Sequence, residues 1–277
     1  MWVMENQQFL GERDSWSRAE QFGDGVFETL LVSAGICHAL PLHAHRLETS
    51  LKRLNILLPA QNLQEMLNGY IVKMVNYSAL TNGVLKVIVS RGNSARGYGY
   101  DPQARACVSV FYSPYERPEE DFYVNGIEVQ YCNTQCAIQP QLAGLKHLNR
   151  LENVLAKSEL SGNCFEGLMS NHLGFVIEGT MSNVFFEKGD SLYTPDLSLS
   201  GVNGVMRDLV FKYCERKKIN LNVMDIKRDN AEQFSSAFMC NSVMGVLPIK
   251  MLNKNNMAIG RVTRQLQLAI ESGEIYA

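Results

Sequence analysis

Hydrophobic residues recur along the first 113 residues with the two periods that distinguish helices from strands. Apolar positions three to four apart predict amphipathic helices over residues 42–58 and 61–77. The first of these helices carries a stripe of Leu47, Leu51, Leu54 and Leu58. Shorter runs predict strands over residues 1–6, 26–33, 84–90 and 106–112, and residues 84–90 are rich in β-branched side chains. This mixture is typical of an α+β domain.

The remainder of the chain shows a similar mixture of periods. Strands are predicted over residues 126–131, 165–170, 175–177, 183–187 and 236–239. Helices are predicted from Val205 through Lys217 and over residues 260–273. A third helix follows Lys146, because Leu148, Leu151 and Leu155 recur there at helical spacing.

A polar segment with two prolines separates these two parts of the chain. Residues 113–121 read Ser-Pro-Tyr-Glu-Arg-Pro-Glu-Glu-Asp, a composition typical of a linker. We therefore predict two domains in an α+β protein. An N-terminal α+β domain covers residues 1–113, a linker covers 114–119, and a C-terminal α/β domain with Lys146 covers 120–277.

Composition and charge narrow the class of protein. The 277 residues are 46% hydrophobic, which is enough for a substantial core, and 26 basic against 28 acidic residues give a net charge of −2. This balance lacks the basic footprint of a nucleic-acid binder. The sequence has neither an apolar run long enough to span a membrane nor the apolar stretch of a signal peptide, and its seven scattered cysteines favour reduced thiols over a metal site. We expect a cytoplasmic enzyme without a structural metal.

Lys146 is the first candidate for chemistry. It ends a polar stretch, residues 133–144, and stands just before a predicted helix. A lysine that is desolvated or placed near another cation has a lowered pKa and becomes a nucleophile able to form a Schiff base. A lone lysine is ordinarily a solvated surface charge, so the interpretation depends on what accompanies it.

Several other residues can bind anions or pair with a cation. Glu178 ends a predicted strand, and Arg46 lies on the polar face of the first helix. The glycines of residues 201–207 precede a helix, whose first amides, at Val205 and Met206, form an anion site. Asn241 and Ser242 follow another strand. Each of these features alone is equally typical of an ordinary solvated surface.

A glycine-rich loop over residues 91–100 contains Arg91, Arg96 and Tyr98. Paired arginines in such a loop can bind a carboxylate or a phosphate. The alternative is a solvated connection between two strands.

Together these residues meet the requirements of pyridoxal 5′-phosphate. That cofactor needs a lysine for the Schiff base, a carboxylate facing its pyridine nitrogen and donors for its phosphate. Lys146 meets the first requirement and Glu178 the second. Arg46, the amides of Val205 and Met206, and Asn241 or Ser242 meet the third.

At this point the sequence resembles the fold-type IV pyridoxal-phosphate enzymes, the family of branched-chain and D-amino acid aminotransferases. The resemblance rests on residues 18–25, 43–47, 91–98, 144–152, 178–179, 201–207 and 240–242. Within this family the chain is most similar to the 4-amino-4-deoxychorismate lyases, through the Lys-His-Leu-Asn-Arg-Leu-Glu run that starts at Lys146. Aminotransferases usually carry a tyrosine five residues after the lysine, where this chain has Leu151.

The resemblance implies a role for each candidate. Lys146 would form the Schiff base and carry protons, and Glu178 would pair with the pyridine nitrogen. Arg46, Val205, Met206, Asn241 and Ser242 would bind the cofactor phosphate. The family is homodimeric, with the cofactor in a cleft between the two domains. The implied reaction eliminates pyruvate from 4-amino-4-deoxychorismate and yields 4-aminobenzoate, a folate precursor, and we expect Arg91, Arg96 and Tyr98 to bind the substrate.

Two other functions remain open. A D-amino acid or branched-chain aminotransferase would use the same Lys146 and Glu178. A binding protein without catalytic activity, or a nucleic-acid binder using Arg150 and Lys157, would belong to another class. Because Lys146 and Glu178 are both present, and because the net charge is −2, the sequence favours the enzyme and predicts no nucleic-acid or membrane partner.

Overall fold

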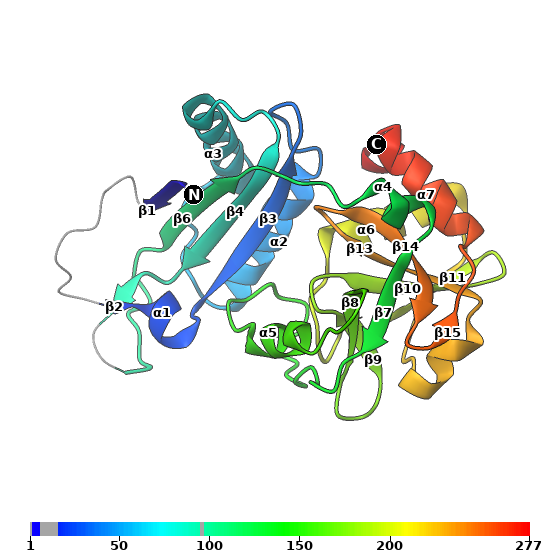
Figure 1. Cartoon of the computed structure of the whole chain (residues 1–277). Helices are drawn as coiled ribbons and strands as arrows, with labels where there is room; N and C mark the ends of the chain where they lie inside the picture. The colour runs from blue at the N-terminus through cyan, green and yellow to red at the C-terminus, as the bar shows by residue number, and fades with distance from the viewer. Residues whose placement is uncertain (1, 6–15, 95–96) are drawn as a thin grey trace. The chain divides into compact units, whose positions relative to one another are not determined.

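The computed structural model describes residues 2–5, 16–94 and 97–277, which form two compact units (Figure 1). The first contains residues 1–116 and returns at 145–149, and the second contains residues 117–144 and 150–277. The chain thus leaves the first unit at residue 116, inside the segment 114–119 predicted as a linker. Lys146, which the sequence placed in the C-terminal domain, packs with the first unit. The limits 1–113 and 120–277 stay a prediction about separately folding domains.

The first unit is an antiparallel sheet with two helices on one face (Figure 1). The strand order is β1 (Trp2–Glu5), β6 (Cys107–Ser113), β4 (Gly83–Ser90) and β3 (Gly25–Val32). The helices are α2 (Leu40–Arg53) and α3 (Leu63–Ser78). Shorter elements are β2 (Trp16–Ser17), α1 (Arg18–Phe22) and β5 (Asn93–Ser94).

The hydrophobic pattern explains how these helices pack. Leu47 and Leu51 of the predicted leucine stripe are fully buried against the sheet, and Leu54 and Leu58 lie at the edge of the same core. Asn62 caps α3, because its side chain accepts a hydrogen bond from the Glu65 amide at 3.1 Å. The two predicted helices and the four predicted strands of this unit are confirmed over the described residues, with ends that differ by up to five residues.

Residues 145–149 complete the first unit along the edge of β3. The Phe27 amide donates to the Lys146 carbonyl at 2.9 Å, and the Leu148 amide donates to the Gly25 carbonyl at 3.0 Å. Val26 and His147 form the antiparallel bridge between them. Lys146 therefore lies in an extended segment, and the helix predicted to follow it, α5 (Leu151–Ser158), begins only at Leu151. The pairing with β3 holds Leu148 out of this helix.

The second unit is built on a large mixed sheet (Figure 1). Among the described residues its strand order is β12, β11, β10, β13, β14, β7, β8 and β9, with β15 beside β14. In chain order these strands are β7 (Ile127–Tyr131), β8 (Cys164–Ser170), β9 (Val176–Gly179), β10 (Asn183–Lys188), β11 (Ser191–Pro195), β12 (Leu221–Met224), β13 (Ser236–Asn241), β14 (Gly245–Leu252) and β15 (Asn255–Asn256). The helices are α4 (Glu120–Val124), α5, α6 (Val205–Lys217) and α7 (Arg261–Glu271), and 3₁₀ turns span Arg228–Gln233 and Glu274–Tyr276.

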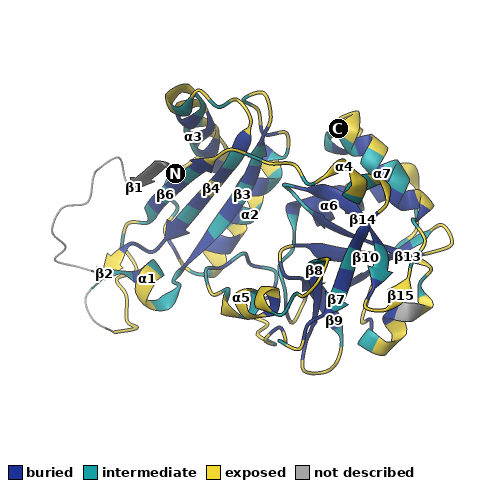
Figure 2. Ribbon diagram, in the orientation of Figure 1, coloured by how far each residue is buried: buried dark blue, intermediate teal, exposed yellow. Residues whose placement is uncertain are grey.

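The central strands of this sheet are buried on both faces (Figure 2). Val184, Phe185 and Phe186 of β10 are consecutive and fully buried, so the strand lacks the alternation of a half-exposed one. The amino end of α7 is tied to the sheet by Glu187, whose carboxylate accepts the amides of Val262 at 3.1 Å and Thr263 at 2.9 Å. The sheet is therefore a rigid base for the loops that leave its strands.

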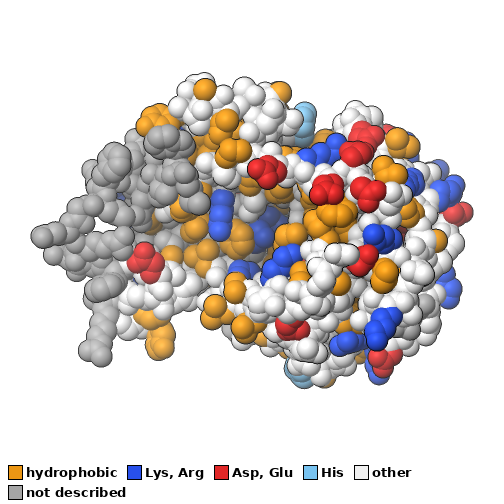
Figure 3. Space-filling view, viewed as in Figure 1, with side chains coloured by type: hydrophobic (Ala, Val, Ile, Leu, Met, Phe, Trp, Pro, Cys, Tyr) orange, Lys and Arg blue, Asp and Glu red, His pale blue; other side chains and the backbone are white. Residues whose placement is uncertain are grey.

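The surface of the second unit carries charges of both signs on the face shown in Figure 3. In the view of Figure 3, basic and acidic side chains are interspersed over the described surface of this unit. Within the described part of the chain, no helix is long and apolar enough to cross a bilayer.

Candidate active site

Glu178 is the best-defined candidate of the second unit. It is the last residue but one of β9 and is 5% exposed, and its Oε2 accepts a hydrogen bond from the Val202 amide at 2.8 Å. Gly201 makes this approach possible, because its φ is +82° and a Cβ there would lie 2.7 Å from Ile177 Cγ2 and 3.2 Å from Glu178 Oε2. The loop after Gly201 therefore packs directly on a buried carboxylate.

The same loop leads into helix α6, as the sequence predicted. Gly204 is the residue before the helix, and the first intrahelical bond runs from the Asp208 amide to the Gly204 carbonyl at 3.0 Å. The amides of Val205 and Met206 precede this bond and so lie at the positive end of the helix dipole. A Cβ at Gly204 would lie 2.0 Å from Asn183 Oδ1, while Asn183 Nδ2 donates to the Val202 carbonyl at 2.9 Å. The helix start is thus fixed against β10.

Asn241 connects a second loop to this region. Its Oδ1 accepts the amides of Val243 at 2.9 Å and Met244 at 2.8 Å, which closes the turn between β13 and β14. Its Nδ2 donates to the Met181 carbonyl at 3.1 Å, in the turn after β9. The side chain predicted to bind the cofactor therefore shapes the loop that carries Ser242, and the cofactor contact itself stays a prediction.

Glu166 is a residue that the sequence analysis missed. It is fully buried in β8, and its carboxylate accepts the amides of Gly167 at 3.0 Å and Thr180 at 3.1 Å, together with the Thr180 hydroxyl. It also accepts the Ser182 hydroxyl at 2.8 Å. Glu166 therefore holds the turn that directly follows Glu178. A glutamate inside an apolar strand is a signal that could have singled it out.

Lys146 is fixed by its backbone. Its strand-like pairing with β3 sets the direction of its side chain, whose Nζ lies 4.4 Å from the centre of the Phe27 ring. A cation over an aromatic face is attracted by the ring quadrupole. Two residues earlier, Gly144 exchanges backbone hydrogen bonds with Gly201, at 2.8 Å, and Asn203, at 3.1 Å. Lys146 therefore lies two residues after Gly144, which is hydrogen-bonded to the loop that packs on Glu178.

Arg46 is held by a buried carboxylate in the first unit. Its Nε and Nη2 donate to the two oxygens of Glu28 at 2.8 and 2.6 Å, and His43 Nδ1 contacts Glu28 at 2.6 Å. Burial alone raises the pKa of Glu28, but the positive charge of Arg46 and the hydrogen bonds from Arg46 and His43 outweigh it and lower this pKa to about 2. Glu28 is therefore ionised at neutral pH.

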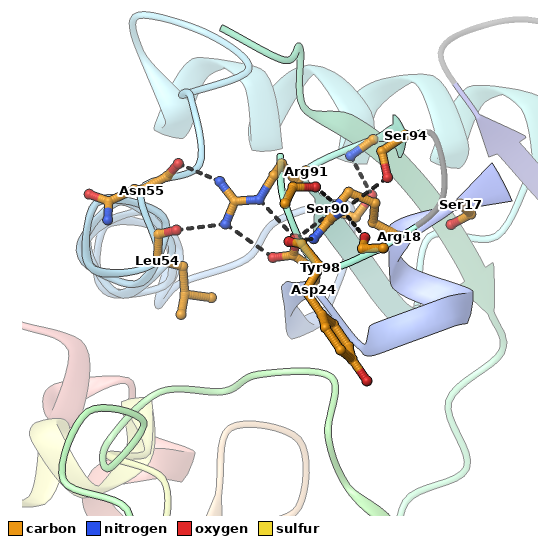
Figure 4. A network of polar contacts seen from close by, with 12 residues as sticks. Ser17, Arg18, Asp24, Leu54, Asn55, Ser90, Arg91, Ser94 and Tyr98 are labelled. Atoms are coloured by element: carbon orange, nitrogen blue, oxygen red, sulfur yellow. Dashed lines mark hydrogen bonds and ion pairs between the residues drawn. The ribbon is translucent and has the colours of Figure 1, made fainter. Parts of the chain in front are cut away.

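A second buried ion cluster joins α1 to the loop after β4 (Figure 4). Asp24 accepts Arg18 Nε at 2.7 Å and Arg91 Nε at 2.8 Å. Arg91 also donates to the carbonyls of Leu54 at 2.7 Å and Asn55 at 2.6 Å, and its guanidinium stacks 3.7 Å from the Tyr100 ring centre. With its donors engaged in this way and only 5% exposure, Arg91 has a structural role in this cluster, and its predicted contact with the substrate stays a prediction.

Arg18, which the sequence analysis also missed, holds the glycine-rich loop. Its Nη1 and Nη2 donate to the carbonyls of Gly99 and Tyr98, both at 3.0 Å (Figure 4). Tyr98 itself is 83% exposed, with its ring 5.1 Å from that of Phe22. Tyr98 therefore stays a candidate for substrate contact, and Arg96 lies outside the described residues.

Residues 25–252 match the amino-transferase class IV family. The chain belongs to this family. Among related sequences, an aminodeoxychorismate lyase from Vibrio harveyi is 33% identical to this protein over 90% of this chain and 92% of the lyase. A D-alanine aminotransferase from Bacillus licheniformis is 26% identical over 94% of this chain and 90% of that protein.

Solved structures agree with this assignment. The crystal structure of 4-amino-4-deoxychorismate lyase from Pseudomonas aeruginosa matches this class IV protein with a TM-score of 0.90 and 35% identity, over 98% of each chain. The two-domain fold-type IV architecture inferred from the sequence is thereby confirmed. In the described part of the chain, no group of three or more histidine, cysteine, aspartate or glutamate residues could hold a metal ion.

Proposed function

We propose that this class IV protein is a pyridoxal 5′-phosphate-dependent 4-amino-4-deoxychorismate lyase. Its similarity to lyases carries the proposal, because identities of 33% and 35% extend over nine tenths or more of the chain. Leu151, in the position where aminotransferases usually carry tyrosine, also supports the lyase. The products would be pyruvate and 4-aminobenzoate.

The residues present fit the cofactor. Glu178 is a buried carboxylate already held by an amide, and it suits a protonated pyridine nitrogen. The amides of Val205 and Met206 at the start of α6 and the Asn241–Ser242 turn would hold the phosphate, together with Arg46. When bound, pyridoxal phosphate supplies an electron sink for the bond cleavage.

Lys146 would perform the proton transfers. As a neutral amine, its Nζ would take the proton from the substrate carbon that bears nitrogen. The carbon–oxygen bond to the adjacent enolpyruvyl group then breaks, the ring becomes aromatic, and Nζ returns a proton to the methylene carbon to give pyruvate. General acid–base catalysis of this kind contributes about 10²- to 10⁴-fold in rate. The extended backbone of residues 145–149 would keep Nζ in place for both transfers.

The substrate carries two carboxylates that need cations or donors. With Arg91 engaged by Asp24, the candidates are Arg96 and Tyr98 of the glycine-rich loop. Arg18 would act indirectly, by holding the loop backbone at Tyr98 and Gly99.

The decisive experiment follows both products. Purified protein with pyridoxal phosphate is given aminodeoxychorismate, generated in place from chorismate and ammonia by a synthase. Equal release of pyruvate and 4-aminobenzoate, lost in Lys146→Ala, is expected. Normal turnover by Lys146→Ala, or the absence of a visible cofactor band with added pyridoxal phosphate, would refute the proposal.

A D-amino acid aminotransferase is the second candidate, since a D-alanine aminotransferase is 26% identical to the chain. The same preparation would then form a keto acid from a D-amino acid and would release no 4-aminobenzoate. Parallel assays with both substrates distinguish the two functions.

We also propose a cytoplasmic homodimer. Helix α5 exposes an apolar row of Leu151, Val154 and Leu155, which are 77, 61 and 58% exposed, and an interface would cover it. The described cysteines are all free thiols, which suits a reducing compartment. Light scattering of the wild type and of Leu155→Glu tests the dimer. A wild-type monomer would contradict it.

A further inference from the structure

Glu28 occupies a position where the sequence pattern calls for an apolar residue. Alternate residues of β3 face the helices, and Val26, Leu30 and Val32 on that face are buried and apolar. Glu28 lies among them with 1% exposure. Burying a carboxylate costs free energy even when it is paired, and apolar replacements of buried ion pairs are often as stable or more stable. The position of Glu28 therefore calls for a reason other than stability.

Its contacts indicate that reason. Both carboxylate oxygens are engaged, since Arg46 Nε bonds to Oε1 at 2.8 Å and Arg46 Nη2 bonds to Oε2 at 2.6 Å. The two bonds run along one edge of the planar guanidinium and fix its plane. His43, one helical turn before Arg46, contacts Oε2 from the same face of α2 at 2.6 Å. Arg46 and His43 thus fix the position of the carboxylate, and the carboxylate in turn fixes the orientation of the Arg46 guanidinium.

The second nitrogen of His43 makes no competing contact within the described part of the chain. Nε2 is buried and has no hydrogen-bond partner there, and the side chain is 1% exposed. The polar contact of this ring is therefore the one between Nδ1 and Glu28 Oε2, at 2.6 Å.

We propose that Glu28 and His43 are positioning residues that pre-order Arg46 for the phosphate of the cofactor. An unanchored arginine loses rotamer freedom when it binds a ligand, and the Glu28 contact removes most of this loss before binding. The inference rests on the proposed function, in which Arg46 binds the phosphate of pyridoxal phosphate.

A purely electrostatic view predicts the opposite sign. The negative charge of Glu28 compensates that of Arg46, so its removal would strengthen the attraction of Arg46 for a phosphate dianion. Orientation and charge compensation thus make contrary predictions for the same substitution.

The test measures the dissociation constants of pyridoxal phosphate and of pyridoxal, which lacks the phosphate. Their ratio isolates the contribution of the phosphate from that of the ring and from folding. Far-ultraviolet circular dichroism shows that each variant is folded. In Glu28→Gln we expect the preference for the phosphorylated form to fall about ten- to a hundred-fold, the range of a charge-assisted hydrogen bond.

Two matched pairs of variants separate position from charge. Glu28→Asp keeps the charge but withdraws the carboxylate by one methylene, and we expect it to lose preference as Glu28→Gln does. His43→Asn keeps a donor near the position of Nδ1, whereas His43→Leu removes it, so only the latter should reduce the preference. A wild-type ratio in Glu28→Asp, or a raised ratio in Glu28→Gln, would overturn the positioning role.

Arg46→Met distinguishes this proposal from the one on which it depends. If Arg46→Met keeps the wild-type ratio, Arg46 does not bind the phosphate and the assignment of the site fails. If Arg46→Met lowers the ratio while the Glu28 and His43 variants do not, only the positioning role fails. Glu28→Gln added to Arg46→Met should cause no further loss.

Discussion

Asp24→Asn tests the ion cluster of the first unit. In the wild type, Asp24 Oδ2 accepts Nε of both Arg18 and Arg91, at 2.7 and 2.8 Å (Figure 4). The asparagine has nearly the same shape but lacks the negative charge and one acceptor oxygen. Two guanidinium groups, whose side chains are 4 and 6% exposed, would lose the counter-charge that Asp24 supplies.

The expected cost follows from this burial. Removing one partner of a buried ion pair costs about 3–5 kcal/mol, because the remaining charge stays desolvated. The Asp24 side chain is 15% exposed and Arg91 retains the Tyr100 ring and two carbonyls, which place the expected loss near the lower end, at about 3 kcal/mol. Glu48→Gln is the matched control, since its pair with Lys52 is exposed and should have little effect on stability.

Urea unfolding followed by tryptophan fluorescence is the appropriate assay, because both tryptophans lie in the first unit. Burial by itself raises the pKa of Asp24, but hydrogen bonds from Arg91 and Arg18 lower it below the ordinary value of 3.8. The stability from ionised Asp24 is therefore present above pH 3.8 and lost as the pH falls through the lowered pKa. A loss below about 1 kcal/mol at pH 6, or a difference from wild type that persists unchanged at low pH, would refute the reasoning.

Three further predictions concern other buried groups. Because the pKa of Glu28 is lowered from 4.5 to about 2, the folded protein should be about 3 kcal/mol more stable with Glu28 ionised, above pH 4.5, than with Glu28 protonated, and this difference is lost as the pH falls toward 2. The difference in unfolding free energy between wild type and Glu28→Gln should therefore be smaller at pH 3 than at pH 6, and an equal difference would contradict the lowered pKa. Gly201→Ala, at φ +82° and 2.7 Å from Ile177 Cγ2, should destabilise the protein by about 2–4 kcal/mol in circular-dichroism melts; wild-type stability would show that the loop relaxes freely. Glu166→Gln should lower the free energy of unfolding by about 2–4 kcal/mol. It should also speed hydrogen exchange of the Thr180 and Met181 amides, which donate to the Glu166 carboxylate; unchanged exchange would show that other contacts hold the turn.

The periodic parts of the chain were predictable because local pattern and tertiary packing agree there. Leu47 and Leu51 marked the buried face of α2, and β-branched runs marked β4. Strand β14 was missed because Pro248 lies inside it, next to a register shift between Ile249 and Met251. The helix after Lys146 was placed too early because pairing of residues 145–149 with β3 is a long-range contact that no local pattern reveals.

The same distinction between local pattern and long-range contact applies to the residues of the candidate site. Glu178 and the start of α6 were predictable, because a strand end and glycines before a helix leave a local pattern. The partners of Arg18 and Arg91 could not be predicted. Arg18 and Arg91 both bind Asp24, which lies 67 residues before Arg91 in the chain. The sequence alone does not show whether an arginine is buried. Glu166 carried a local signal as a glutamate inside an apolar strand, but the sequence did not reveal its partners Thr180 and Ser182, which lie 14 and 16 residues further along the chain.

The pairing of residues 145–149 with β3 means that a fragment ending at residue 116 would lack part of its own sheet. It would expose the amide of Phe27 and the carbonyl of Gly25 along a bare strand edge, the kind of edge that promotes aggregation. During synthesis, the first unit would wait for about thirty more residues before its sheet is closed. One of the residues that close the sheet is the proposed catalytic Lys146, so the backbone that carries this lysine is fixed only when the sheet of the first unit is complete.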